Sequence, residues 1–310
     1  MKICFVGIGS IGKRHLKNLT SISKEFDFKL EIHAFRNSDR ELESEVKVLI
    51  DKQIFEKKDL HDNYDVVFIT NPTSLHYTSI DLLATKTKHM FIEKPIFEDI
   101  TYDIDSLTLR NNGIYYVAAP LRYTEVIQHL KELLKEEKIY SVRTICSSYL
   151  PDWRLGVDYR KVYSAKKGQG GGVSIDLIHE WDYLTYLFGF PQKVFNLYGQ
   201  FSHLEIDSED LSIYIAKYRD RLIELHLDYF GRIPKREIEI YTETGTITGN
   251  LIDNEILFTD GREKIKFHGD RNEMYIKEMR NFLDCILNNK ENENNIYHAY
   301  KMLKLAKGII

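Results

Sequence analysis

Short apolar runs alternate with stretches of helical spacing through the first 120 residues. Ile80, Leu83 and Ala84, for example, fall on one helical face after an expected cap near Thr73 or Ser74. The apolar runs are Lys2–Val6, Leu30–Phe35, Asp65–Thr70, His89–Ile92 and Ile114–Ala118. Strands that alternate with helices predict a parallel, doubly wound sheet.

The pattern changes after Pro120. One helix is expected over Val126–Lys135, and later segments alternate strictly, with Ile223, Leu225 and Leu227 separated by polar residues. This period of two predicts an open, mostly antiparallel sheet with one wetter face. Two helices, roughly 272–287 and 296–308, close the chain. We therefore predict an α/β domain over 1–120 and an α+β domain over 121–310, with the last helix able to pack on the first domain.

The length of 310 residues agrees with two domains, and the net charge of −4 argues against nucleic-acid binding. The three cysteines are far apart and are expected to be reduced thiols. Glycines interrupt the apolar N-terminus, so we expect no signal peptide. No apolar run approaches membrane-spanning length, so no membrane span is expected. Together with the cysteines, this indicates a cytoplasmic protein. No Cys/His cluster has zinc-ligand spacing, so no metal site is expected, and His15 receives no functional role.

A glycine motif, Gly7-Ile8-Gly9-Ser10-Ile11-Gly12, follows the first apolar run directly. A tight turn without side chains lets a diphosphate approach the N-terminus of the next helix. The motif predicts a Rossmann dinucleotide site formed by Gly7, Gly9, Ser10, Ile11 and Gly12. The alternative is a plain turn between strand and helix.

The end of the second strand indicates which nicotinamide cofactor is preferred. Sites for NAD usually place an acid here, whereas this chain has Arg36, Asn37 and Ser38, with no acid before Asp39. Arg36 could pair with a 2′-phosphate while the other two hydrogen-bond to it, so NADP is favoured over NAD. A solvated turn is the alternative.

Four motifs in order resemble those of the glucose–fructose oxidoreductase, inositol dehydrogenase and MocA (Gfo/Idh/MocA) family. They are Gly7–Gly12, Thr70-Asn71-Pro72 with His76, Glu93-Lys94-Pro95, and Gly170–Gly172 followed by Asp176, His179 and Asp182. The resemblance covers nearly the whole chain. It implies a Rossmann domain, a second domain whose open sheet often mediates oligomerisation, and hydride transfer at a sugar or inositol carbon. It also implies that Thr70, Asn71, Pro72, His76 and Glu93 lie near the cofactor.

Lys94 is the first candidate for catalysis. Because it precedes Pro95, its backbone is biased toward an extended conformation at the end of a strand, where ligands bind in doubly wound sheets. In the resembled family the matching lysine lies by the nicotinamide, and its bond to proline is often cis. A lysine there can move the proton of the reacting hydroxyl. The alternative is a surface lysine.

Asp176 and His179 are expected to share one face of a helix at spacing i, i+3. His179 could act as a general acid or base, or could orient the substrate while Lys94 moves the proton, with Asp176 assisting. Many family members space this pair by four residues. A capping acid and a half-buried histidine are the plainer alternative.

The long segment after residue 148 is rich in rings and guanidinium groups. Rings stack on sugar faces and arginine forks onto carboxylates or phosphates, so an acidic or nucleotide-linked sugar is expected. The alternative is a loop held by its own aromatics and Arg–Asp pairs. The candidate substrate residues are Arg122, Tyr149, Trp153, Arg154, Tyr159, Arg160 and Tyr163.

Taken together, the sequence predicts an NAD(P)-dependent oxidoreductase acting on CH–OH groups of a sugar, sugar acid or nucleotide sugar. The segment after residue 148 resembles members that act in bacterial surface-carbohydrate biosynthesis. A homodimer or homotetramer is expected. A biliverdin- or imine-type reductase and a non-catalytic redox sensor that only holds the cofactor are the alternatives.

Overall fold

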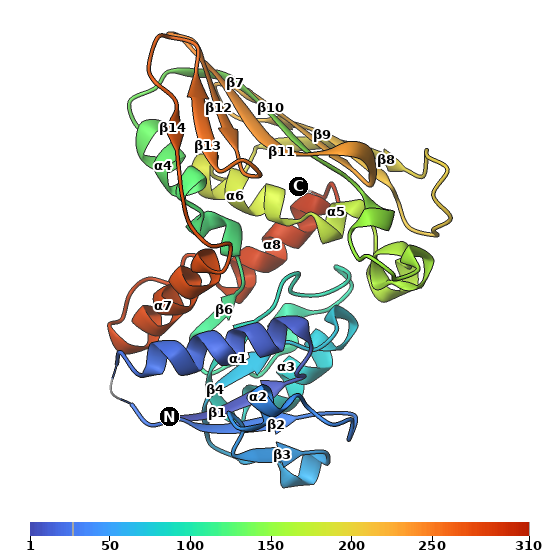
Figure 1. Cartoon of the computed structure of the whole chain (residues 1–310), viewed down its shortest axis with the longest axis vertical. Helices are drawn as coiled ribbons and strands as arrows, with labels where there is room; N and C mark the ends of the chain where they lie inside the picture. The colour runs from blue at the N-terminus through green and yellow to red at the C-terminus, as the bar shows by residue number, and fades with distance from the viewer. Residues whose placement is uncertain (27, 310) are drawn as a thin grey trace. The chain divides into compact units, whose positions relative to one another are not determined.

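A computed structural model describes residues 1–26 and 28–309 (Figure 1). The chain forms two compact units, one made of 1–118 with 272–300 and the other of 119–271 with 301–310. The segment 272–300, expected in the second domain, therefore belongs to the first unit. The reason is packing: Met279, Phe282 and Leu283 of α7 (Glu273–Leu287) are buried in one core cluster with Leu16 and Leu19 of α1 (Ser10–Ser23).

The first unit is built on a parallel six-stranded sheet in the order β3-β2-β1-β4-β5-β6. Its strands are β1 (Lys2–Val6), β2 (Glu31–Phe35), β3 (Lys52–Ile54), β4 (Tyr64–Ile69), β5 (Thr87–Ile92) and β6 (Tyr115–Val117). The predicted Rossmann fold is confirmed. The strand order reverses between β1 and β4, which pair in parallel, so their carboxyl ends form the switch point where such sheets bind ligands.

Strand β3 was not predicted because it has three residues, of which Lys52 and Gln53 are polar. The core between the sheet and its helices contains stacked rings. Phe5 lies 4.5 Å from Phe68, and Phe68 lies 5.3 Å from Phe91, measured between ring centroids. The other helices of this sheet's connections are α2 (Ser44–Lys47) and α3 (His76–Ala84). The expected cap of α3 lies instead in a short 3₁₀ turn, Thr73–Leu75.

The second unit is built on an eight-stranded sheet in the order β14-β13-β12-β11-β7-β10-β9-β8. The strands are β7 (Ile139–Tyr149), β8 (Lys193–Gly199), β9 (Leu211–Lys217), β10 (Leu222–Asp228), β11 (Phe230–Thr242), β12 (Thr246–Asn250), β13 (Glu255–Phe258) and β14 (Ile265–Lys266). Only the β7–β10 pair is parallel, which confirms the predicted, mostly antiparallel sheet.

Helices α4 (Glu125–Leu133), α5 (Val173–Asp176) and α6 (His179–Phe188) lie along one face of this sheet (Figure 1). Helix α8 (Ile296–Ala306) ends against β9, where the Tyr214 hydroxyl donates to the Ala306 carbonyl. Several large apolar side chains of β8 and β9 are exposed, including Phe195, Leu197 and Ile213. The homodimer or homotetramer expected from the sequence stays a prediction.

Over the described residues, no helix is both long enough and apolar enough to cross a membrane. The same part of the chain, 1–26 and 28–309, has no cluster of His, Cys, Asp and Glu suited to a metal ion.

Candidate functional site

The turn between β1 and α1 is closely packed at two of its three glycines, against its own backbone and against the residues that follow β4. Gly7 has φ +88°, and a Cβ there would lie 3.0 Å from Asn71 Cα. A Cβ on Gly12 would lie 2.6 Å from the Gly7 carbonyl oxygen and 2.9 Å from Thr70 Oγ1. A Cβ on Gly9 would meet no described atom within 4 Å. The turn thus requires two glycines for its own shape and leaves an open surface at the third.

The start of α1 suits an anion. Gly9 is its N-cap, and within the described chain no side chain caps it and its first turn has no acidic residue. The backbone N–H groups that open a helix need acceptors, and the helix dipole favours negative charge there. Ser10 and Ile11 begin the helix directly behind the exposed Gly9. These residues fit the diphosphate of a dinucleotide.

Thr70, Asn71 and Pro72 follow β4 at the switch point. The Thr70 hydroxyl donates to the Gly7 carbonyl at 2.7 Å, and the Asn71 amide donates to Ser79 at 2.8 Å. These bonds hold the β4 turn against the glycine turn.

At the end of β2, Arg36 is buried and its guanidinium donates to Gln53 Oε1 at 2.5 Å and to the Arg40 carbonyl. Asn37 and Ser38 are exposed beside it. The expected residue types are therefore presented at this edge, with Arg36 held in place by two bonds.

Glu93, Lys94 and Pro95 follow the carboxyl end of β5, and the Lys94–Pro95 peptide is cis, as expected from the resemblance. Glu93 Oε1 lies 2.6 Å from His15 Nε2, and Glu93 Oε2 accepts from the Lys94 backbone N–H at 3.2 Å. One buried carboxylate therefore connects α1 to the backbone of Lys94.

Burial pushes the pKa of Glu93 upward, but the hydrogen bond and charge of His15, with the charges of Lys94 and His76, outweigh it. The pKa of Glu93 lies below its ordinary value, so this carboxyl stays ionised at neutral pH.

Sequence reasoning missed His15. Its side chain is fully buried, with its ring 4.8 Å from Phe91 and 6.1 Å from Tyr275 between centroids. Its Nδ1 has no hydrogen-bond partner among the described residues. No local pattern pairs residue 15 with residue 93, so only the glycine motif three residues earlier could have drawn attention to it.

His76 joins the two turns that follow β4 and β5. Its Nδ1 lies 3.0 Å from the Pro95 carbonyl oxygen, and its Nε2 lies 3.1 Å from the Asn71 carbonyl oxygen. Burial lowers the pKa of this imidazole, although the carbonyls and Glu93 oppose that effect. His76 therefore contacts backbone on both sides of its ring.

Asp176 and His179 do not share the face of one continuous helix, and that expectation was wrong. Asp176 ends α5 and the half-buried His179 begins α6, with a break at Leu177 (φ −95°, ψ +25°). Asp176 is buried and accepts hydrogen bonds from the hydroxyls of Tyr163 and Tyr229. Burial and the neighbouring carboxylate raise the pKa of both phenols, which stay protonated as donors.

The first turn of α6 is fixed by two buried ion pairs. Arg122 binds Asp182 through two bonds of 2.9 and 2.7 Å, and Glu180 lies 2.9 Å from Arg236 Nε. The Arg122 fork, expected to hold substrate, is instead paired with Asp182. Glu180 and Asp182 both follow His179 in sequence, and their pairs hold its helix against the unit's core.

The segment after residue 148 is held by one internal Arg–Asp pair, of the kind that the alternative expected, and by contacts with Glu205 outside the segment. Arg160 pairs with Asp158 and Glu205, both at 2.8 Å, and the Tyr159 hydroxyl accepts from the Glu205 N–H. The segment contains short 3₁₀ turns over Leu150–Asp152, Tyr159–Lys161, Tyr163–Ala165 and Lys167–Gln169.

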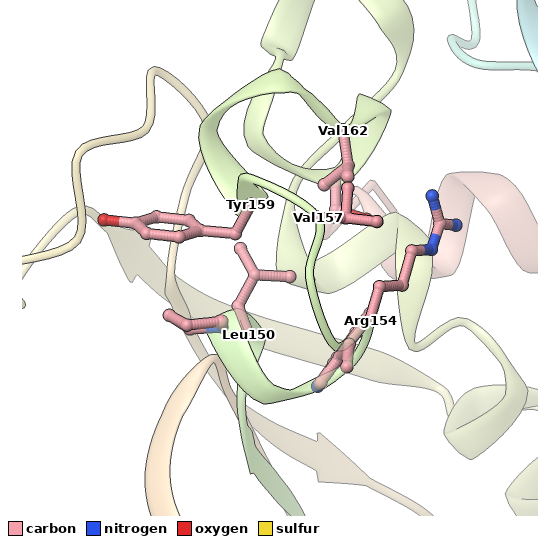
Figure 2. Close-up of a pocket in the computed structure, with 8 residues that line it drawn as sticks. Leu150, Arg154, Val157, Tyr159 and Val162 are labelled. Carbon is pink, nitrogen blue, oxygen red and sulfur yellow. The ribbon is translucent and has the colours of Figure 1, made fainter.

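Figure 2 shows Leu150, Tyr159, Val157, Val162 and Arg154, which line a small space within this segment. Its volume is about 10 Å³, too small for a sugar and close to that of one water. Tyr149 lies under Arg232 at 3.6 Å, and Trp153 donates to Ser148 at 2.9 Å.

We predict that replacing His15 by Leu lowers the free energy of unfolding by about 3 kcal/mol, because a buried carboxylate loses its partner. His15→Gln keeps an amide donor and should cost about 1 kcal/mol. Urea unfolding at pH 7 measures both. Because His15 is the main cause that lowers the pKa of Glu93, its loss raises that pKa in both variants, and the difference between them should shrink as the pH falls and the carboxyl protonates in the folded state. Equal losses for the two variants at every pH would contradict the pairing.

Comparison with known proteins agrees with this geometry. Residues 1–107 match the family model described as oxidoreductase family, NAD-binding Rossmann fold, and residues 131–310 match the model of the same family's C-terminal alpha/beta domain. Myo-inositol 2-dehydrogenase of Thermotoga maritima is 23% identical over 306 residues, which covers 91% of this chain and 87% of that protein.

Among solved structures, levoglucosan dehydrogenase in complex with NADH and levoglucosan superposes with a TM-score of 0.82 at 17% identity, covering 100% of this chain and 96% of that one. The WlbA dehydrogenase of Bordetella pertussis in complex with NADH and UDP-GlcNAcA gives a TM-score of 0.78 at 17% identity, covering 100% and 94%. The chain belongs to the Gfo/Idh/MocA family and is an NAD(P)-dependent oxidoreductase.

Proposed function

We propose that the protein transfers a hydride between a nicotinamide cofactor and a hydroxyl or keto carbon of a sugar, sugar acid or nucleotide sugar. The observation that carries the proposal is the position of Lys94. Its turn follows the carboxyl end of β5 and is tied through Glu93 and His15 to the helix behind the glycine turn. An ionisable group held at that edge of a doubly wound sheet is placed where ligands of such folds react.

The cofactor would be held by residues of the first unit. The N–H groups at the start of α1, behind Gly9, would bind its diphosphate, and the turn of Thr70, Asn71 and Pro72 would line its path along the switch point. His76 would act by bracing that turn, since its ring already contacts backbone carbonyls of both turns. When bound, the nicotinamide supplies the hydride or accepts it.

Lys94 would move the proton of the reacting hydroxyl at its Nζ atom, accepting it in oxidation and donating it in reduction. His179 would bind the substrate or share in proton transfer. Asp176 would act as a positioning residue, because both of its oxygens accept hydrogen bonds from tyrosines.

The half-buried Tyr149 and the exposed Trp153 and Arg154 are the remaining substrate candidates of the segment after residue 148. Two faces of rings and one guanidinium suit a sugar that carries an acidic or phosphate group. A solved relative in complex with NADH and UDP-GlcNAcA supports this class. The role in surface-carbohydrate biosynthesis is proposed from the resemblance of this segment to family members of that kind.

NADP is the proposed preferred cofactor. The end of β2 presents Arg36, Asn37 and Ser38 and no carboxylate, which suits a 2′-phosphate better than a free ribose hydroxyl. Two solved relatives contain NADH, so the affinities of this protein for NADPH and NADH have to be compared directly.

The proton-transfer role of Lys94 is tested by substitution. Lys94→Ala should lower kcat by about 10²–10⁴-fold, because proton transfer loses its group, while cofactor affinity changes less than about threefold. Turnover should be screened with myo-inositol, levoglucosan and UDP-sugars, following cofactor absorbance. Lys88→Ala is the matched control, since Lys88 lies on β5, the strand that precedes Lys94, and pairs with Asp65 on the surface.

Full kcat in Lys94→Ala would refute the proton-transfer role. Cofactor binding by the wild-type protein without turnover of any sugar would instead favour a redox sensor.

The second prediction concerns Arg36. Arg36→Ala should weaken NADPH binding about tenfold, through the loss of a charged contact worth about 1.4 kcal/mol, and leave NADH binding unchanged. Titration of cofactor fluorescence measures both affinities. Because NADH serves as the internal control, equal weakening for both cofactors would indicate a disturbed turn. Tighter NADH binding that is insensitive to the substitution would refute the preference for NADP.

A further inference from the structure

The second unit has a groove of about 540 Å³ on its surface, between the end of α4, the end of α6 and the hairpin that joins β9 to β10. Small-molecule sites in proteins have volumes of about 300–1,000 Å³, so this groove is large enough for an organic ligand. Its lining residues are Lys131, Leu134, Lys135, Ile139, Leu187, Phe188, Phe190, Gln192, Tyr218, Arg219, Asp220 and Arg221. None of them is among the cofactor or substrate candidates described above.

The floor of the groove is apolar. Leu134, Ile139 and Leu187 line it together with the rings of Phe188 and Phe190. Tyr218 is buried at one side, its hydroxyl donates to the Gly189 carbonyl at 3.0 Å, and burial raises its pKa, so it adds a neutral ring. Such a floor favours a flat or compact apolar body over a bare ion.

The rim of the groove is positive. Lys131, Lys135, Arg219 and Arg221 face one acidic lining residue, Asp220. The chain as a whole has a net charge of −4, so this is a local excess of positive charge. Such an excess concentrates anions at the site.

Two of the four cations are already paired. Lys135 lies 2.6 Å from Glu132, and Arg221 donates two hydrogen bonds to Asp220, which lower the pKa of that carboxyl and keep it ionised. The exposed Arg219 forms no close ion pair with a carboxylate among the described residues, although its charge helps to lower the pKa of Asp220.

The fourth cation, Lys131, has its ammonium 3.3 Å from the centroid of the Tyr186 ring. Arg219 and Lys131 are therefore the groups with charge left to bind an anion.

We propose that this groove binds a small amphipathic anion, in which an apolar ring or chain carries one phosphate, sulfonate or carboxylate. The apolar part would cover Leu187, Phe188 and Phe190, and the anionic group would pair with Arg219 and Lys131. Exposed cations alone contribute little in water, so the apolar floor must supply part of the affinity. The proposal is independent of the oxidoreductase reaction.

The test is calorimetric titration of the full chain with 1-naphthyl phosphate. Arg219→Glu should weaken binding at least fivefold, because a hairpin cation is replaced by an anion. Lys193→Glu is the matched control: Lys193 lies 4.6 Å from the Phe195 ring on β8, outside the groove, and its reversal should leave the affinity unchanged. Circular dichroism of both variants checks that they are folded.

Competition with inorganic phosphate and with 1-naphthol, at the concentration of the probe, separates the two halves of the ligand. Neither should displace 1-naphthyl phosphate, since each offers one half of the proposed contacts. Unchanged affinity in Arg219→Glu, equal loss in Lys193→Glu, or full displacement by phosphate alone would each overturn the proposal.

Discussion

The first unit depends on a turn that has no room for a side chain at two of its three glycines. Gly7 and Gly12 press against Asn71, Thr70 and the turn's own carbonyl, and this close packing brings the end of β4 next to the start of α1. The helix then begins at Ser10, after the N-cap residue Gly9 and without a side-chain cap. Because the turn is closely packed on one side and open on the other, the backbone N–H groups at the start of α1 can bind an anion.

A buried ion pair connects α1 to the turn that follows β5. His15 on α1 holds Glu93, and Glu93 accepts from the backbone of Lys94, so the residue proposed to move a proton is fixed from the helix proposed to hold the cofactor. His76 connects the turns after β4 and β5 in the same way. In the second unit, the ion pairs of Glu180 and Asp182 fix the first turn of α6 around His179. In both units the candidate groups lie beside buried charges that hold their backbone.

The sequence predicted those features that depend on local spacing. Apolar periodicity placed most strands of the first sheet, and the glycine motif predicted the turn between β1 and α1. Contacts between distant residues were not predictable, because no local pattern records them. The bond from His15 to Glu93 spans 78 positions, and the pair of Arg122 with Asp182 spans 60. The break at Leu177 was missed because an i, i+3 spacing does not show whether the two residues lie in one helix or in two consecutive helices.

The most direct test of the account is equilibrium binding of NADPH and NADH to Gly9→Ala. Its Cβ would meet no protein atom, so the fold should keep its melting temperature, while the added methyl blocks a diphosphate and weakens both cofactors about tenfold or more. Gly168→Ala, whose Cβ also meets nothing within 4 Å, should leave stability and binding unchanged. Wild-type affinity in a folded Gly9→Ala protein would contradict the claim that this turn holds the cofactor.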